Sequence, residues 1–356
     1  MSAAPSPARR LRVALFGATG VVGQRLLRRL AKHPDFELVA VAASERSAGR
    51  RYAEAVRWLS PDGIPSSAAG LVLRAVDELA AAGGYDLALS ALDTETARRV
   101  EPLLAERGIA VVTNASALRM DPDVPLVVPE VNSDHLEILR ERSPGRGALV
   151  ANPNCATIGL VLALAPLAER FGVERVRVTT LQAASGAGHP GVPALELLGN
   201  VVPGIAGEEE KLETEPTKIL GRRRGARIEP AGLAVSADTH RVPVIDGHLL
   251  AVSVGLGRRV SAAEAARAFD EYRPPAVAAA LPSAPARALE RVEGEQRPQP
   301  RLDAGRGGGM TVTVGRVRTC PLFDLRFTAL VDNVERGAAG GTMLLAELLT
   351  RGGYVR

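Results

Sequence analysis

LRVALFGATGVVGQRLLRRLAK, residues 11–32, decides how this chain folds. A β-type apolar run over 12–16 ends in the glycine-rich turn GATGVVG, 17–23, which leads directly into a helical pattern over 22–32. A strand, a tight turn and a helix in this order open a βαβ unit, and backbone N–H groups at such a turn can hold a pyrophosphate. Because the spacing is not the commoner GxGxxG, a turn without a ligand stays an alternative. The predicted dinucleotide site comprises Gly17, Ala18, Thr19, Gly20, Val21 and Val22.

The four residues after the second strand-like run, 37–42, bear on which dinucleotide is bound. They are Ser44-Glu45-Arg46-Ser47, about 20 residues beyond the glycine turn. A carboxylate such as Glu45 suits the ribose 2′-hydroxyl of NAD, whereas an arginine with hydroxyl donors suits the 2′-phosphate of NADP. We favour NADP, held by Ser44, Arg46 and Ser47, because an arginine between two serines forms a better phosphate site than a ribose site.

Strands and helices alternate through the first half of the chain, which indicates a parallel sheet. The further β-type runs are 87–92, 110–113 and 126–128, and a helical pattern covers 97–107. After 147–153 the pattern changes to an apolar helix over 157–171 and longer strands, which favour a mixed or antiparallel sheet. Those strands cover 175–182, 233–244, 249–256, 311–318 and 322–330. Residues 273–309 indicate a long loop, and 337–351 a final helix.

Composition bounds the class of protein. The 356 residues carry 46% hydrophobic and 24% charged side chains, which is ordinary globular usage, and the length favours two domains. The net charge of +4 is small and its arginines are scattered among acids, so we expect no nucleic-acid partner. Residues 1–10 contain no signal-peptide core, and the longest apolar run, 158–168, is shorter than the ~20 residues of a membrane span. Two cysteines fit a reducing compartment, so we expect a cytoplasmic protein without a membrane partner.

Cys155 lies in Asn152-Pro153-Asn154-Cys155, just before the apolar helix. Asn154 is a plausible N-cap, which puts Cys155 in the first helical turn, where partial positive charge favours the thiolate. The alternative is a buried, inert cysteine that only packs. Cys320 has no such setting and is expected to be a small core residue.

Two histidines and an arginine lie close together in the stretch 235–248. Arg241 can hold a carboxylate with two hydrogen bonds, and a histidine can pass protons near neutral pH. Position alone does not choose between His240 and His248, and solvated residues at a sheet edge are the alternative. His33 and His135 are expected on helix surfaces.

The charged stretch 208–218 and the following Arg222-Arg223-Arg224 form the most polar part of the second half. From spacing alone they indicate a solvent-facing helix with i,i+4 pairs, followed by a basic loop.

A nicotinamide site, an activated cysteine, a proton-passing histidine and anion-binding arginines suit one type of reaction. The thiolate attacks an activated acyl group, and hydride from the cofactor reduces the resulting thioester to an aldehyde. Backbone N–H groups and Asn154 would support the oxyanion.

Motifs along nearly the whole chain resemble those of the aspartate-β-semialdehyde dehydrogenase family, in its archaeal and fungal-type branch. They are GATGVVG (17–23), RSAG (46–49), NASALRM (114–120), VPEVN (128–132), NPNC (152–155), QAASGAG (182–188), EEEK (208–211), RVPVIDGH (241–248), PQPR (298–301) and RGAAG (336–340).

The resemblance implies catalytic roles for three residues. Cys155 matches the acyl-accepting nucleophile, Gln182 the residue that orients the intermediate, and His248 the acid/base histidine. Asn154, assigned above to support of the oxyanion, completes the predicted catalytic group. No metal is implied.

The resemblance also implies binding roles. Arg241 and Glu208 match the pair that holds the α-carboxylate and α-amine of the substrate, and three residues match the phosphate pocket: Arg119, Asn114 and Lys211. The cofactor-binding residues gain Ser185, Gly186 and Asn333.

The implied fold is α/β, with a Rossmann-like parallel-sheet NADP domain over 1–150 and an α+β catalytic and dimerisation domain with a mixed sheet over 151–332. A C-terminal helix in 333–356 is expected to pack back on the NADP domain. Members of the family form homodimers or homotetramers. The implied activity is NADP-dependent reductive dephosphorylation of L-aspartyl-4-phosphate to aspartate-4-semialdehyde and phosphate, in aspartate-family amino-acid biosynthesis.

Two departures from the family pattern are Thr239-His240, where Cys-Asn is expected, and Asp93, where proline is expected. His240 would add bulk beside Arg241, and Asp93 would add an anion near the cofactor. Both leave room for a paralogue that reduces a related acyl phosphate. An acyl-CoA reductase such as malonyl-CoA reductase is the alternative enzyme, and a non-catalytic NADP sensor is the alternative from another class.

Overall fold

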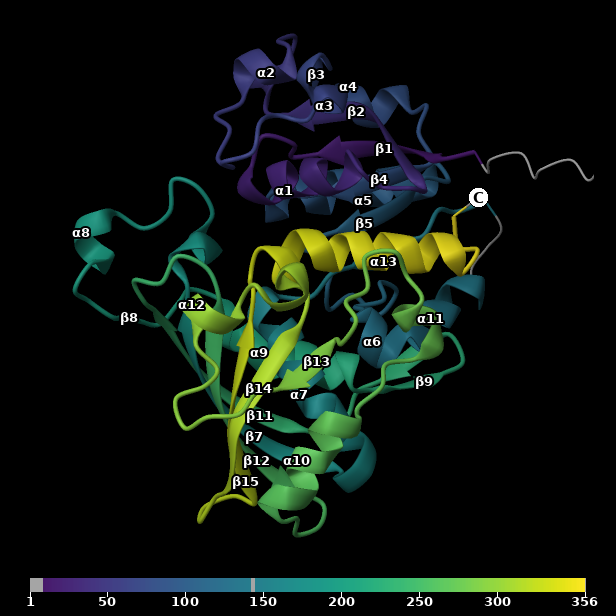
Figure 1. Cartoon of the computed structure of the whole chain (residues 1–356). Helices are drawn as coiled ribbons and strands as arrows, with labels where there is room; N and C mark the ends of the chain where they lie inside the picture. The colour runs from purple at the N-terminus through teal and green to yellow at the C-terminus, as the bar shows by residue number, and fades with distance from the viewer. Residues whose placement is uncertain (1–8, 142–144, 356) are drawn as a thin grey trace, which may run out of the picture.

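Figure 1 shows the computed structural model, which describes residues 9–141 and 145–355. Six parallel strands form the N-terminal sheet, in the order β3-β2-β1-β4-β5-β6. They are β1 (Leu11–Phe16), β2 (Phe36–Ala43), β3 (Leu73–Ala75), β4 (Leu87–Ser90), β5 (Ala110–Thr113) and β6 (Leu149–Ala151). This order reverses between β1 and β4, and ligands of such sheets bind at the carboxyl ends of the strands beside that reversal.

The helices of this half are α1 (Val21–Leu30), α2 (Tyr52–Ala55), α3 (Ser66–Ala69), α4 (Val76–Ala82), α5 (Thr94–Glu106) and α6 (Pro129–Asn132). The C-terminal helix α13 (Gly340–Arg351) joins them, since its Met343, Leu344 and Leu348 share one apolar core with β1, β4 and α1. In Figure 1 α13, in yellow, runs between the N-terminal sheet and the rest of the molecule.

The second sheet has seven strands in the order β13-β14-β15-β12-β7-β11-β8. Its strands are β7 (Val173–Gln182), β8 (Val202–Pro203), β11 (Ala234–Arg241), β12 (His248–Leu256), β13 (Leu289–Arg291), β14 (Val312–Thr319) and β15 (Leu325–Val331). The pairs β7–β11 and β13–β14 are parallel and the others antiparallel, so the predicted mixed sheet is confirmed. The apolar helix α7 (Cys155–Phe171) packs on one face, against Val178, Leu250 and Phe327.

The remaining helices of the second half are α8 (Ala194–Leu197), α9 (Glu208–Ile219), α10 (Ala262–Glu271), α11 (Ala276–Ala279) and α12 (Pro300–Asp303), and β9 (Arg222–Arg224) pairs with β10 (Arg227–Glu229). The α/β class with its two sheets is confirmed. Within the described residues, no helix is long and apolar enough to cross a membrane.

Three expectations about local structure were wrong. Residues 126–128 form only a single bridge from Leu126 to Ala151, and β3 and β6 were missed because three-residue strands leave almost no periodic pattern. The stretch 273–309 is not one loop, since it contains α11, β13 and α12. The predicted domains begin at residue 1 and end at residue 356, and both ends lie outside the described residues. So do residues 1–8, which belong to the stretch expected to lack a signal peptide.

Candidate active site

Cys155 is the first residue of α7, and Asn154 caps that helix as predicted. Oδ1 of Asn154 accepts hydrogen bonds from the backbone N–H groups of Ala156 at 3.0 Å and Thr157 at 3.2 Å. Gly337 packs against the cysteine so closely that a Cβ on it would lie 2.5 Å from Cβ of Cys155. A glycine is therefore required behind the thiol.

A cavity of about 320 Å³ opens beside this thiol and reaches the first turn of α1. It collects 11 of the 21 predicted site residues, from both halves of the chain: Val21, Val22, Asn114, Arg119, Asn154, Cys155, Ser185, Gly186, Glu208, Lys211 and Asn333. One cavity thus joins the start of α1 to the cysteine.

His248 and Arg241 lie next to Gly186 at the edge of this cavity. A Cβ on Gly186 would lie 2.6 Å from Nη1 of Arg241 and 3.1 Å from Nε2 of His248, so a larger residue here would displace these two side chains. The backbone N–H of Ala183 donates to Nδ1 of His248 at 3.0 Å, and its carbonyl accepts from Arg241 Nη1 at 2.8 Å. Nδ1 of His248 is therefore an acceptor, and the proton of the neutral ring sits on Nε2.

Nε2 of His248 is buried without a hydrogen-bond partner among the described residues. Burial, with Arg241 adding to it, lowers the pKa of His248 to about 3. The histidine is thus a neutral ring with an unused N–H, ready to donate to an oxygen of a bound substrate.

The protonation expected for Cys155 was wrong. Burial, followed by the negative charge of Glu208, raises the pKa of Cys155 to about 12, although Arg119, the N–H of Ala156 and Arg241 each act to lower it. The helix start does favour the thiolate, but removing the sulfur from water outweighs that effect.

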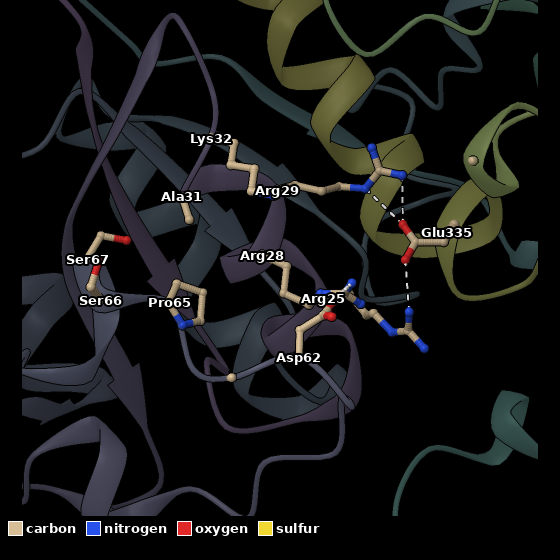
Figure 2. Close-up of a pocket in the computed structure, with 12 residues that line it drawn as sticks. Arg25, Arg28, Arg29, Ala31, Lys32, Asp62, Pro65, Ser66, Ser67 and Glu335 are labelled. Atoms are coloured by element: carbon tan, nitrogen blue, oxygen red, sulfur yellow. Dashed lines mark hydrogen bonds and ion pairs between the residues drawn. The ribbon is translucent and has the colours of Figure 1, made fainter.

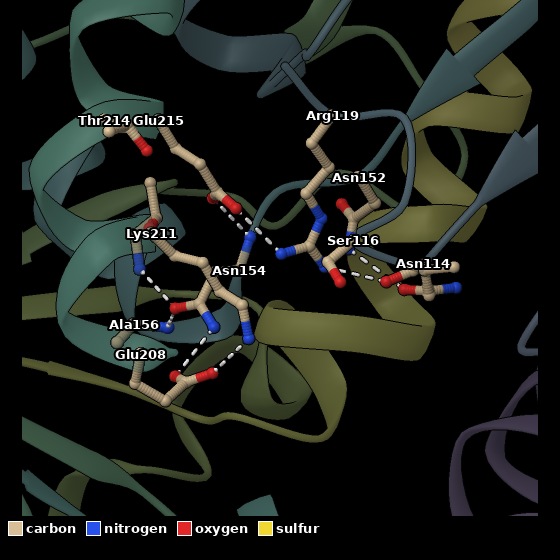
Figure 3. Close-up of polar contacts among 12 residues, drawn as sticks. Asn114, Ser116, Arg119, Asn152, Asn154, Ala156, Glu208, Lys211, Thr214 and Glu215 are labelled. Atoms are coloured by element: carbon tan, nitrogen blue, oxygen red, sulfur yellow. Dashed lines mark hydrogen bonds and ion pairs between the residues drawn. The ribbon is translucent and has the colours of Figure 1, made fainter. Parts of the chain in front are cut away.

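Helix α9 places the carboxylate of Glu208 and the ammonium group of Lys211 beside the cysteine, so the interpretation of 208–218 as a solvent-facing helix was wrong. Figure 3 shows Glu208 accepting from Lys211 Nζ and Asn154 Nδ2, each at 2.8 Å. Gln182, buried at the end of β7, donates to the same carboxylate at 3.4 Å. Burial opposes the charge, but Lys211 and these amide donors outweigh it, so the pKa of Glu208 lies below its ordinary value.

Arg119 is buried and held by two partners. Its Nη1 donates to Glu215 Oε1 at 2.8 Å and its Nη2 to the carbonyl of Asn114 at 2.7 Å, while Nε is buried with no partner among the described residues. The amide oxygen of Asn114 accepts from Asn152 and Thr342. Sequence reasoning missed Glu215, although it follows Glu208 and Lys211 at helical spacing.

The glycine turn has the geometry of a phosphate site. Gly17 has a φ of +76°, and a Cβ there would lie 2.4 Å from the carbonyl oxygen of Ala91. Helix α1 begins after Gly20 with no side-chain cap, so its first N–H groups are free for an anion. Arg46, in the 3-10 turn Glu45–Ser47 that follows β2, is exposed and has no hydrogen bond to the described residues, which suits a 2′-phosphate.

Both departures from the family pattern have local explanations. Asp93 is the N-cap of α5: its carboxylate accepts from the N–H of Thr96 at 3.0 Å and from the hydroxyl of Thr96 at 2.8 Å. His240 pairs across the sheet with Leu181, and strand alternation puts its side chain on the face opposite Thr239 and Arg241. The expectation that His240 crowds Arg241 was wrong.

Three other sequence expectations fail. His33 and His135 are buried, not on helix surfaces: His33 pairs with Glu347 at 2.8 Å, and Nδ1 of His135 contacts Asn132 at 2.9 Å. Cys320 is half-buried at the turn between β14 and β15 and is not a core residue.

A second cavity, of about 690 Å³, lies on the far face of α1 and is lined by Arg25, Arg28, Arg29 and Lys32. Figure 2 shows Arg25 and Arg29 converging on Glu335, with Nη1 of Arg25 at 3.1 Å and Nη2 of Arg29 at 2.7 Å. Glu335 opens the π-helical turn Glu335–Ala339 that carries Gly337 behind Cys155. These two ion pairs therefore connect helix α1 to the segment that packs behind the thiol of Cys155.

Two family models match the chain. "Semialdehyde dehydrogenase, NAD binding domain" covers residues 12–139, and "Semialdehyde dehydrogenase, dimerisation domain" covers residues 164–336.

Relatives that match over nearly their full length are semialdehyde dehydrogenases too. The chain is 46% identical to aspartate-semialdehyde dehydrogenase of Archaeoglobus fulgidus, over 96% of this chain and 98% of the relative. It is 43% identical to that of Cryptococcus neoformans, over 99% and 100%. The crystal structure of aspartate semialdehyde dehydrogenase with NADP from Candida albicans superposes with a TM-score of 0.90 at 37% identity, covering 98% of this chain and 100% of the other. The chain therefore belongs to the aspartate-semialdehyde dehydrogenase family, in the branch with archaeal and fungal members.

Proposed function

We propose that this protein catalyses the NADP-dependent reductive dephosphorylation of L-aspartyl-4-phosphate to L-aspartate-4-semialdehyde, through a thioester on Cys155. The observation that carries the proposal is the single cavity that contains the cysteine, two cations and the first turn of the dinucleotide helix. The relatives named above are aspartate-semialdehyde dehydrogenases by name, which supports the proposal.

The polar groups around the cavity match the two ends of the substrate. The guanidinium of Arg241 binds the α-carboxylate, and the carboxylate of Glu208 pairs with the α-ammonium group. Arg119 and Lys211, the two cations that line the cavity, bind the phosphate. Asn114 acts through its carbonyl, which holds Arg119.

The first step forms the thioester. The sulfur of Cys155 attacks the acyl carbon, the C–O bond to phosphate breaks, and the thiol proton leaves with the phosphate. Because Asn154 and Glu215 occupy the neighbouring N–H groups, the N–H of Cys155 itself is the donor left for the oxyanion.

The second step releases the aldehyde. NADPH, when bound, supplies the hydride that reduces the thioester. The Nε2–H of His248 then stabilises the resulting alkoxide, the C–S bond breaks as the aldehyde forms, and the thiolate takes up a proton. Gly17 to Val22, with Ser44, Arg46 and Ser47, hold the cofactor. Ser185, Gly186 and Asn333 complete its site, and Asn333 Nδ2 donates to Ser185 Oγ at 2.8 Å.

Turnover in the reverse direction tests the proposal. Aspartate semialdehyde, NADP and phosphate should give NADPH, whereas malonyl-CoA with NADPH should not be consumed. Cys155→Ala should abolish turnover while NADPH binding, measured by fluorescence, is kept. Consumption of malonyl-CoA would favour an acyl-CoA reductase, and binding without turnover of either substrate would favour a sensor. Activity of Cys155→Ala above about a thousandth of wild type would contradict the nucleophile.

We further infer a homodimer that forms through the face of the seven-stranded sheet opposite α7. Two sets of residues that pair across the strands lie on that face. The first is His240, Leu181 and Leu249, and the next is Asp238, Thr179 and Ala251. Leu181 is 38% exposed, and a tetramer would pair two such dimers. Two cysteines without a disulfide support a cytoplasmic setting.

A further inference from the structure

One face of α9 carries four charged residues at spacings of three, four and three: Glu208, Lys211, Glu215 and Lys218. The first two face the cavity, whereas Glu215 is 1% exposed and Lys218 is 6% exposed. Ionised side chains are seldom buried unless their partners need them. The structure therefore raises the question of what the inner pair does.

Glu215 links Arg119, the arginine proposed to bind phosphate, to the start of helix α7. Its Oε1 accepts from Arg119 Nη1 at 2.8 Å, and its Oε2 accepts from the backbone N–H of Asn154 at 2.8 Å (Figure 3). Asn154 directly precedes Cys155 and caps α7. One carboxylate thus fixes the guanidinium and the backbone beside the sulfur relative to each other.

Lys218 holds the other end of Arg119. Its Nζ donates to the backbone carbonyl oxygens of Arg119 at 2.8 Å, Asp121 at 2.7 Å and Val124 at 2.8 Å. These three bonds fix the loop that follows β5, so Arg119 is anchored through both its side chain and its main chain by the same helix.

We propose that Glu215 and Lys218 are positioning residues that set the distance between Arg119 and Cys155, and thereby the place of the substrate phosphate relative to the attacking sulfur. This inference rests on the proposed function. It assigns to the inner half of the α9 face a task distinct from substrate contact, which belongs to Glu208 and Lys211.

Glu215→Gln tests the side-chain anchor. A glutamine oxygen can still accept from Asn154, but the amide NH₂ then faces the guanidinium, so Arg119 loses its acceptor and counter-charge. We expect the KM for phosphate to rise about tenfold or more, while the KM for NADP changes less than about twofold. Glu210→Gln, on the exposed side of α9, is the matched control and should behave as wild type.

A double-mutant cycle with Arg119→Met separates positioning from general stability. If Glu215 acts through Arg119, adding Glu215→Gln to Arg119→Met should raise the phosphate KM by less than about twofold further. If the two substitutions raise the phosphate KM independently, so that their factors multiply, the proposal is overturned. An equal rise in the KM for NADP would overturn it too. Should Glu215→Gln fail to fold, Lys218→Met in the same cycle tests the main-chain anchor, with the same expected non-additivity and the same contrary result.

Alkylation of Cys155 by iodoacetamide, followed by mass spectrometry, needs no turnover. Phosphate should slow alkylation of the wild type and the Glu210→Gln control but not of Glu215→Gln. If that pattern holds in a protein that does not turn over aspartate semialdehyde, the positioning role stands and the proposed function fails. Equal protection of wild type and Glu215→Gln, or none in the wild type, would overturn the positioning role.

Discussion

At the scale of single residues, burial dominates the chemistry of the site. Cys155 has a helix start, two arginines and the backbone N–H of Ala156 that all favour its thiolate, yet its pKa is raised to about 12 by burial and by Glu208. The cost of removing a charge from water exceeds these attractions. The nucleophile is therefore kept as a thiol in the absence of substrate.

His248 makes stability depend on pH. Its folded-state pKa of about 3 lies below the ordinary value of 6.5, so the unfolded chain binds the proton more tightly between these pH values. This contribution to stability is complete above pH 6.5 and is lost as the pH falls toward 3. In His248→Asn, the fall in the free energy of unfolding between pH 7 and pH 4.5 should be smaller than in wild type by about 1–3 kcal/mol. Urea unfolding at both pH values measures it, and equal falls would contradict the buried neutral ring.

Arg46 should decide the choice of cofactor. Because it is exposed and has no hydrogen bond to the described residues, its main effect is on a bound 2′-phosphate. Arg46→Ala should weaken NADPH at least about tenfold and NADH less than about twofold, measured by fluorescence titration. Equal losses for both cofactors would instead point to Glu45 and to NAD.

At the scale of elements, the starts of three helices explain why particular polar residues lie where they do. Asn154 caps α7, Asp93 caps α5 and Ser261 caps α10 in a capping box with Glu264. Asp93 is one of the two departures from the family pattern, and its carboxylate is occupied by Thr96. Its carboxylate thus starts a helix, at a position that also lines the cavity beside Cys155.

Asp93→Ala should accordingly lower stability more than activity. Loss of a capping carboxylate costs about 1 kcal/mol, so the midpoint of thermal unfolding should fall by a few degrees. The KM for NADP should stay within about twofold of wild type, since the substitution removes no cofactor-binding group. A large change in that KM with an unchanged midpoint would show that Asp93 acts on the cofactor.

At the scale of the whole molecule, the two sheets meet at one cavity, and the chain crosses between them twice. The second crossing runs through Asp332 to Gly340, where Glu335 is clasped by Arg25 and Arg29 and Gly337 touches Cys155. The final helix α13 then packs on the first sheet. The position of the nucleophile relative to the cofactor therefore depends on contacts between segments some 300 residues apart.

The open face of the second sheet should govern assembly. Leu181→Arg would place a charge in the middle of the inferred dimer face, so the mass measured by light scattering should fall from a dimer, or a tetramer, toward a monomer. Leu322→Arg, at an 84% exposed position in the turn before β15, is the matched control and should leave the mass unchanged. A monomeric wild type would contradict the inferred interface.

The sequence by itself determined the parallel sheet, the cofactor turn and the capped cysteine, because these depend on local signals: a strand, glycines and a helix start within 11–32, and Asn154 beside Cys155. Its motifs also identified the family and predicted the site residues. Only the tertiary structure decided which side of α9 is buried, that Glu215 holds Arg119, and that His240 faces away from Arg241. It also decided the pKa of Cys155, because burial and the approach of distant charges are absent from any local pattern.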